Sequence, residues 1–174
     1  MCSSDLQDGV DHGKACKPGQ ECKTGGLLQL SLPVLKAPLI IGAHCFIAAG
    51  AYLRGGCWVD EHCIFGPGAE LKTSFVFSGS KLAHFNFVGD SVLGHGVNLE
   101  AGSIVANYRN ERADKEVQVC IDGRLQRTGC DKFGALLGDQ SRVGANGVLA
   151  PGAVISPGGI VGRGQVFDGE VQDA

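Results

Sequence analysis

Residues 35–76 read LKAPLI, IGAHCF, IAAGAY, LRGGCW, VDEHCI, FGPGAE and LKTSFV when they are divided into hexads. Each hexad begins with a large apolar residue, and those that begin at residues 41 to 65 carry a cysteine or an alanine four places later. An α-helix cannot keep this register, because its side chains repeat every 3.6 residues, whereas short strands that turn a corner every six residues can. The pattern predicts a parallel β-solenoid, whose stacked coils bury one another's apolar residues.

The apolar register continues along most of the chain. Three hexads make one triangular coil, so residues 18 apart are expected in adjacent coils at the inter-strand spacing of roughly 4.8 Å. Steps of five residues before Val88 and before Leu93 predict a tightened corner, and such a break in a regular array is often where function lies. The predicted inward residues are Leu35, Ile41, Ile47, Leu53, Val59, Phe65, Leu71, Phe77, Ala83, Val88, Leu93, Leu99, Val105, Leu137, Val143, Leu149, Ile155, Val161 and Phe167.

Two segments fall outside this register. Residues 1–26 are polar and aperiodic and are expected to form a flexible leader, whereas residues 27–174 form one all-β domain that begins with a capping strand over 27–34. The register is lost again over about 106–136. There Asp122-Gly123 lies between two strand-like runs, which is a strong signal for a two-residue hairpin turn. We therefore expect a hairpin arm extruded from the solenoid.

Charge and composition exclude several classes of partner. The net charge is −3 and no lysine–arginine cluster is present, which argues against a nucleic-acid partner. No apolar stretch is long enough to cross a bilayer, and the first residues lack the apolar core of a signal peptide. A cytoplasmic protein without membrane partners is expected.

The chain has eight cysteines, of which Cys45, Cys57 and Cys63 occupy the small inward position of the repeat. A buried free thiol behaves there as a small hydrophobic group. Cys45 and Cys63 are 18 residues apart and should stack, so a disulfide between them is the alternative.

Arg54 and Lys72 each follow a large aliphatic residue directly and are 18 residues apart, which predicts that they stack on one face. Two like charges this close are unfavourable unless an anion lies between or in front of them, and a phosphate would serve. The alternative is a pair of solvated surface side chains.

His84 is predicted in the same outward position two faces further on, where a neutral imidazole could accept a proton from an amine. A corner or a subunit interface would have to bring it to the two cations.

His44 and His62 are also 18 residues apart and should stack. They resemble half of a metal site, but the solenoids of γ-class carbonic anhydrases use three histidines that meet between subunits. No H-x₄-H motif is present here, and His95 does not fall in a matching column. We expect no metal, and a metal-dependent hydratase is the least favoured alternative.

Four motifs resemble the acetyltransferase half of bifunctional glucosamine-1-phosphate N-acetyltransferase / N-acetylglucosamine-1-phosphate uridylyltransferase. They are ELK at 70–72, HFNFVGDS at 84–91, VNLEAG at 97–102 and ANY at 106–108. The insert, with VQVCIDGR at 117–124, TG at 128–129 and FGALLGD at 133–139, is more similar to archaeal sugar-1-phosphate nucleotidylyltransferases. The resemblance covers about residues 35–165. It implies a left-handed parallel β-helix of hexapeptide repeats and a homotrimer that binds coenzyme A between neighbouring solenoids.

The resemblance also implies an activity and a set of roles. The chain would transfer an acetyl group from acetyl-CoA to the amine of a sugar phosphate, in nucleotide-sugar biosynthesis, without a metal. His84 matches the general base. The residues matched to substrate binding are Arg54, Lys72, Phe87 and Asn98, and those matched to the acetyl-CoA pocket are Ala101, Asn107 and Tyr108.

Three departures from the family pattern keep a second hypothesis open. Phe87 replaces a tyrosine, Ala113 stands where a lysine is expected, with Arg112 and Lys115 nearby, and Glu100 replaces a glycine beside the predicted pocket. The alternative is therefore a catalytically degenerate module that binds a sugar phosphate or serves assembly. Nothing before residue 27 could form a nucleotide-binding fold, so we do not expect uridylyl transfer by this chain. The sequence leaves open whether a separate nucleotidyltransferase subunit associates with it.

Overall fold

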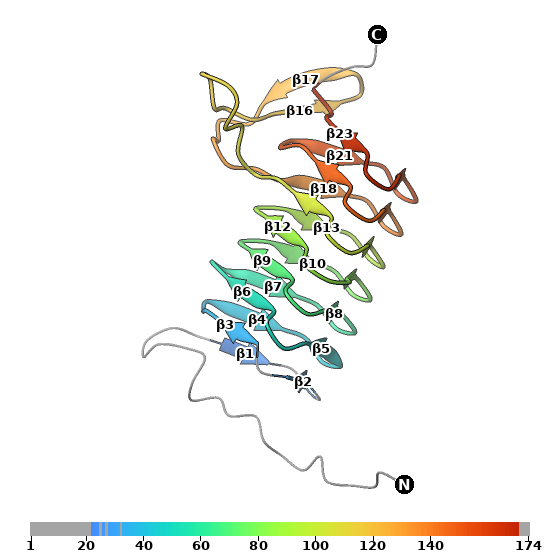
Figure 1. Cartoon of the computed structure of the whole chain (residues 1–174). Helices are drawn as coiled ribbons and strands as arrows, with labels where there is room; N and C mark the ends of the chain where they lie inside the picture. The colour runs from blue at the N-terminus through green and yellow to red at the C-terminus, as the bar shows by residue number, and fades with distance from the viewer. Residues whose placement is uncertain (1–21, 25, 27, 32, 171–174) are drawn as a thin grey trace, which may run out of the picture.

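The computed structural model describes residues 22–24, 26, 28–31 and 33–170 and consists of strands wound into a three-sided prism (Figure 1). Three parallel sheets, A, B and C, form its walls. Sheet A contains β1 (Cys22–Thr24), β4 (Leu39–Ile41), β7 (Cys57–Val59), β10 (Phe75–Val76), β13 (Val92–Leu93), β18 (Ala135–Leu137) and β21 (Ala153–Ile155). Sheet B contains β2 (Leu28–Leu30), β5 (Cys45–Ile47), β8 (Ile64–Phe65), β11 (Lys81–Leu82), β14 (Asn98–Leu99), β19 (Arg142–Val143) and β22 (Ile160–Val161). Sheet C contains β3 (Val34–Leu35), β6 (Tyr52–Arg54), β9 (Glu70–Lys72), β12 (Phe87–Gly89), β15 (Ile104–Val105), β20 (Val148–Leu149) and β23 (Val166–Phe167).

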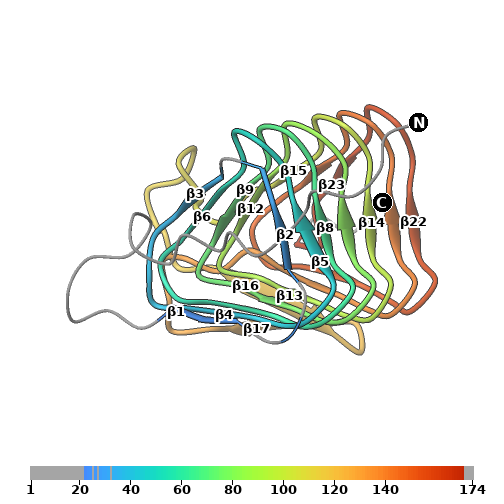
Figure 2. The same cartoon turned by 90° about the horizontal axis from the view of Figure 1, so that it is seen from below.

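Each coil passes through the sheets in the order C, A, B. Seen from the N-terminal end, the chain runs counter-clockwise as it recedes, which is the left-handed sense (Figure 2). The predicted left-handed parallel β-helix is therefore confirmed. No described residue belongs to a helix long and apolar enough to span a membrane.

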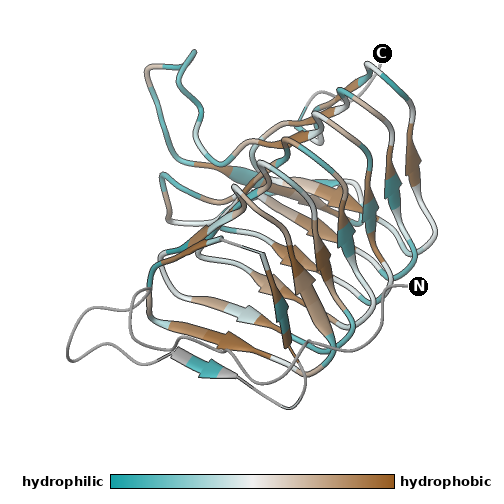
Figure 3. Ribbon diagram, turned by 60° about the horizontal axis from the view of Figure 1, so that its bottom comes forward, coloured by the Kyte–Doolittle hydropathy of each residue, from teal (hydrophilic) through white to brown (hydrophobic). Residues whose placement is uncertain are grey.

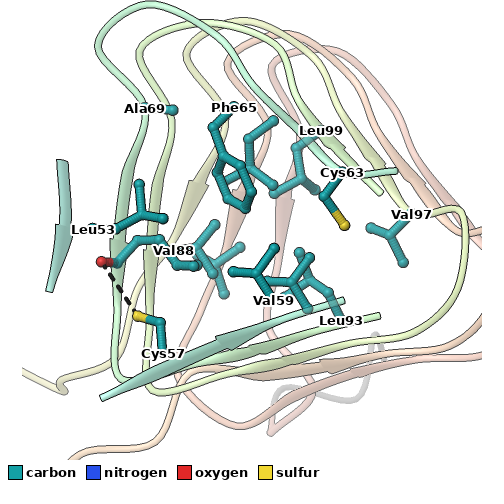
Figure 4. Packing of buried hydrophobic residues seen from close by; sticks show 14 of the residues in the cluster. Leu53, Cys57, Val59, Cys63, Phe65, Ala69, Val88, Leu93, Val97 and Leu99 are labelled. Atoms are coloured by element: carbon teal, nitrogen blue, oxygen red, sulfur yellow. Dashed lines mark hydrogen bonds between the residues drawn. The ribbon is translucent and has the colours of Figure 1, made fainter. Parts of the chain in front are cut away.

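The prism encloses one apolar core (Figure 4). The predicted ladder holds from Leu35 to Leu71 and from Val88 onward, and Cys45, Cys57 and Cys63 are buried free thiols, as expected. Two positions of the predicted ladder are wrong. Val76 and Leu82 are completely buried, whereas Phe77 is 42% exposed and Ala83 is only partly buried.

The reason is a corner that is one residue shorter than the others. The five-residue steps run from Leu71 to Val76 and from Val88 to Leu93, and both lie at the corner between sheets C and A. A buried serine closes each short corner, because the Oγ atoms of Ser74 and Ser91 donate to the carbonyls two residues back at 2.8 and 2.7 Å. Residues 17 apart therefore stack in these coils, as in the pairing of β8 with β11.

The predicted hairpin leaves the prism at this same corner, between β15 and β18. Its antiparallel strands β16 (Gln118–Ile121) and β17 (Arg124–Arg127) are joined by Asp122 and Gly123, both with positive φ. This confirms the turn read from the sequence. Val117, just before β16, is fully buried, so the base of the hairpin is packed. The hairpin lies at the C-terminal end of the solenoid (Figure 1).

The solenoid begins before the predicted boundary at residue 27. Cys22–Thr24, assigned to the leader, form β1 and pair in parallel with β4. Backbone pairing of this kind needs no large apolar residue and so leaves little trace in the sequence. Residues 1–21 and 25 of the predicted leader lie outside the described residues. The predicted capping strand contains β2 and β3.

Candidate functional site

Arg54 and Lys72 stand in register on β6 and β9, on the outer face of sheet C. The predicted stacking is confirmed, but each cation has a carboxylate partner that the sequence analysis missed. Arg54 Nη2 lies 2.6 Å from Glu70 Oε1, and Lys72 Nζ lies 2.7 Å from Asp90 Oδ2. The pairs screen the repulsion between the two cations, and a bound phosphate would have to share or displace these carboxylates.

Asp90 connects two of the predicted site residues. Its carboxylate accepts hydrogen bonds from Lys72 Nζ and from the side-chain amide of Asn107. Asp90 lies at the C–A corner with φ 49°, and its carbonyl accepts the Gly134 N–H, where the chain returns from the insert. The corner therefore ties Lys72, on the predicted substrate side, to Asn107, on the predicted cofactor side.

Gly89 creates the space in which these groups meet. It is the register partner of Lys72, and a Cβ on it would lie 2.5 Å from Asn107 Nδ2 and 2.9 Å from Phe87 Cζ. Any side chain here would displace one of them. The absence of a Cβ thus lets Phe87 and Asn107 gather beside Lys72.

His84 lies at the corner between sheets B and C and is exposed. The sequence placed it directly after an inward Ala83; because Leu82 is the inward residue instead, His84 is shifted onto the corner. Its Nδ1 is 3.1 Å from the place of a Gly66 Cβ, so the imidazole rests over the glycine of the preceding coil. Within the described residues no hydrogen bond to this imidazole exists.

Phe85, beside His84, is the largest exposed side chain of this corner. It is 71% exposed and has a φ of 52°, a region that bulky residues avoid. A Cβ on Gly68 would lie 2.6 Å from its ring. Gly66-Pro67-Gly68 therefore makes room for both His84 and Phe85.

Ala101 follows His84 along this corner, since the next residue, Gly102, donates its N–H to the His84 carbonyl at 2.8 Å. The neighbouring Glu100 is not a free charge. Its Oε2 accepts hydrogen bonds from Arg163 Nε and from the Ala145 N–H, both at 2.9 Å. The Arg163 guanidinium and then the Ala145 N–H lower the pKa of the Glu100 carboxyl.

Two cations occupy the region where Ala113 replaces the expected lysine. Lys115 Nζ lies 5.3 Å from the centre of the Tyr108 ring, and Arg112 pairs with Glu170. Beneath them the fully buried Arg109 holds Asp168 through two hydrogen bonds of 2.7 Å. This network fastens the insert to the last described coil.

Asn98 lies on another wall. It projects from β14 on sheet B, in register with Lys81 and Arg142. Seven of the eight predicted site residues thus lie in three places: four beside sheet C (Arg54, Lys72, Phe87 and Asn107), two at the B–C corner (His84 and Ala101) and Asn98 on sheet B. The eighth, Tyr108, lies beside Lys115 of the insert. Arg54 and Lys72 are together with Phe87 and Asn107, but His84 and Asn98 are not on their face.

His44 and His62 stack as predicted, with ring centres 4.9 Å apart and planes 15° from parallel. In the described part of the chain no three His, Cys, Asp or Glu side chains are grouped to hold a metal ion. Cys45 and Cys63 are both free.

Part of the chain matches a known family of repeat proteins. A family model described as bacterial transferase hexapeptide (six repeats) matches residues 38–73. The chain is 38% identical over 119 residues to a bifunctional sugar-1-phosphate nucleotidylyltransferase/acetyltransferase of Sulfurisphaera tokodaii, which covers 65% of this chain and 29% of the relative. It is 31% identical over 132 residues to the bifunctional protein GlmU of Desulfitobacterium hafniense, which covers 76% of this chain and 25% of the relative.

These matches confirm the resemblance that the motifs indicate, while the chain spans less than a third of the length of either relative. A crystal structure of a hexapeptide transferase family protein from Anaplasma phagocytophilum superimposes with a TM-score of 0.50 at 15% identity. It covers 88% of this chain and 77% of that chain, which shows a shared fold.

Proposed function

We propose that this hexapeptide-repeat protein is an acyl-CoA-dependent N-acetyltransferase that acts on an amino-sugar phosphate such as glucosamine-1-phosphate. The observation that carries the proposal is the B–C corner, where an exposed His84 stands one coil from Ala101 with no competing hydrogen bond from the described residues. The sugar amine attacks the thioester carbonyl, and His84 takes the proton that the amine loses. The C–S bond breaks, the coenzyme A sulfur takes up that proton from His84 and leaves as the thiol, and an amide is formed.

Arg54 and Lys72 would hold the sugar phosphate. Their carboxylate partners Glu70 and Asp90 fix both cations in one orientation before substrate arrives, which reduces the ordering cost of binding. Phe87 offers an apolar surface beside them. On the donor side, Ala101, Asn107 and Tyr108 would line the path of acetyl-CoA, with Asn98 contacting the sugar from sheet B.

The separation of these groups on different walls supports a homotrimer, because a neighbouring copy could bring one wall opposite another. The outer face of sheet A suits such packing. Ile40, Phe75 and Phe77 are 47%, 53% and 42% exposed there, and Trp58 packs edge-on against Phe77. Exposed apolar residues on a continuous face are typical of subunit interfaces. The cytoplasmic location expected from the sequence stays a prediction, and association with a separate nucleotidyltransferase subunit stays an open question.

A non-catalytic module that binds a sugar phosphate is the second candidate. Phe87 lacks the hydroxyl of the family tyrosine, and Lys115 does not occupy position 113. Both differences remove groups that would contact the substrate, while Arg54 and Lys72 remain.

An assay of coenzyme A release with acetyl-CoA and glucosamine-1-phosphate separates the candidates. The wild type should turn over at least roughly 100-fold faster than His84→Ala, the usual contribution of a general base. His95→Ala is the matched control, since His95 is exposed on a different corner and bonds to Ser78 at 2.9 Å. Equal rates for wild type and His84→Ala would exclude catalysis by His84, and binding without turnover would favour the second candidate.

A further inference from the structure

Sheet B carries a row of three polar side chains that the sequence analysis did not bring together. Lys81, Asn98 and Arg142 are register partners on the adjacent strands β11, β14 and β19, and all three are exposed. The strand spacing places the two cations roughly 10 Å apart with an amide between them. Ile64 and Ile160 continue the row on either side, so the polar groups are confined to three neighbouring coils. In Figure 3, successive strands of this wall carry hydrophilic segments.

The two cations of this row differ from those on sheet C. Neither the Lys81 ammonium nor the Arg142 guanidinium has an ion pair or hydrogen bond with any residue that the structure describes, whereas the side chains of Arg54 and Lys72 each hold a carboxylate. A guanidinium with free N–H groups beside a free amide can bind a phosphate without displacing a protein partner.

A hollow of about 270 Å³ adjoins the row on sheet B. Asn98, Arg142, Gly144 and Gly162 are among the residues that line it. Glu100 and Arg163 also line it, and the Glu100 carboxylate pairs with Arg163 and accepts the Ala145 N–H. Lys81, Arg142 and Arg163 against Glu100 give this region a net charge of +2.

We propose that Lys81, Asn98 and Arg142 form an anion site for a phosphate ester, distinct from the Arg54–Lys72 pair. The guanidinium of Arg142 can donate two parallel hydrogen bonds to the phosphate oxygens, and the ammonium of Lys81 adds a point charge. The side-chain amide of Asn98 donates a hydrogen bond between them. The proposal deepens the proposed function, because a transfer reaction at His84 involves two phosphorylated substrates. Lys81 lies on β11, the strand that leads into the corner at His84 three residues later, so the proposed site adjoins the reacting corner along the chain.

The phosphate could belong to either substrate. Acetyl-CoA carries its phosphates on a nucleotide at the far end of a long arm, and the amino sugar carries one on the ring. If Arg54 and Lys72 hold the sugar phosphate, the row on sheet B is left for the donor nucleotide, and Asn98 then contacts the donor and not the sugar. Acetyl-CoA and the amino-sugar phosphate both carry phosphate esters, and separate binding titrations distinguish between them.

Calorimetric titration of the full chain with inorganic pyrophosphate, coenzyme A and glucosamine-1-phosphate tests the site without turnover. The variants are Lys81→Gln and Arg142→Gln. Their matched controls are Lys132→Gln and Arg124→Gln, which change the same charge at exposed positions on the insert. Loss of one charge-assisted hydrogen bond should weaken binding of pyrophosphate at least roughly tenfold in the two row variants and less than twofold in the controls.

Comparing the affinities for coenzyme A and glucosamine-1-phosphate shows which substrate supplies the phosphate. A selective loss of coenzyme A binding identifies the donor nucleotide, and a selective loss of glucosamine-1-phosphate binding identifies the acceptor; either outcome supports the site. Equal affinities in row and control variants, or no binding of any probe to the wild type, would overturn it. Repeating the titrations in His84→Ala keeps this result separate from catalysis. A row-dependent affinity without any acetyl transfer would refute only the proposed function.

Discussion

Sheets B and C each carry two cations close together, but among the residues that the structure describes only the cations on sheet C have partners. Arg54 and Lys72 are held by Glu70 and Asp90, and Lys72 and Asp90 are only 19% and 16% exposed. Lys81 and Arg142 project from sheet B with no partner among the described residues. The repeat thus stacks cations on both walls, and within the described chain the stacked cations of sheet B are the ones without a carboxylate partner. A cation that already holds a carboxylate contributes to the fold as well as to binding, whereas an open cation is free to serve a ligand alone.

The largest effect is expected for a third kind of cation, the fully buried Arg109. Arg109→Ala leaves the Asp168 and Glu170 carboxylates without their shared partner and should lower the free energy of unfolding by about 3–5 kcal/mol. Urea denaturation of wild type and variant measures this difference. A loss below about 1 kcal/mol would mean that the insert is not fastened by this network.

Lys72→Ala should cost less, about 1–3 kcal/mol, because it leaves the largely buried Asp90 with the Asn107 amide as its remaining side-chain partner. The double variant Lys72→Ala with Asp90→Ala controls for the unpaired carboxylate and should recover part of the loss. If the single variant is as stable as the wild type, the Lys72–Asp90 pair does not stabilise the fold.

The contribution of the Arg109–Asp168 ion pair to the free energy of unfolding should depend on pH. The Arg109 guanidinium lowers the pKa of the Asp168 carboxyl below its ordinary value of 3.8. The unfolded chain therefore takes up this proton first as pH falls, so the stabilisation by Asp168 is complete above about pH 4 and is lost as pH falls through the lowered folded pKa. The difference in unfolding free energy between wild type and Asp168→Asn should accordingly shrink below pH 4. A difference that stays constant with pH would contradict the ion pair.

The smallest effect is expected on sheet B. Lys81→Ala and Arg142→Ala remove exposed cations without partners in the described chain and should change the unfolding free energy by less than about 0.5 kcal/mol. Thermal and urea denaturation of each variant beside Lys72→Ala checks this directly. A loss as large as that of Lys72→Ala would show that the row on sheet B is structural and erase the contrast between the two walls.

The sequence predicts most of the fold because one inward residue per hexad is enough to define a wall. It misassigns Phe77 and Ala83 because each adjoins another apolar residue, Val76 or Leu82, and apolarity alone does not distinguish them. The distinction comes from Ser74, whose hydroxyl closes the corner one residue early. The hairpin is predictable because Asp122-Gly123 adopts positive φ by itself.

The candidate site is predictable only where the 18-residue spacing holds. Arg54 and Lys72 stack because no short corner separates them. The 18-residue spacing does not predict the row on sheet B. Lys81 and Asn98 are separated by a coil shortened to 17 residues, and Asn98 and Arg142 are separated by the insert. Side-chain partners such as Asp90 depend on rotamers, which a repeat pattern does not specify.

A crystal structure with bound coenzyme A would test the central claim most directly. We expect the thiol end to lie at the corner beside His84 and Ala101, and phosphate oxygens to lie within hydrogen-bond distance of Arg142 or Lys81. Phosphates bound to Arg54 and Lys72 on sheet C, with sheet B empty and His84 remote from the thiol, would contradict it.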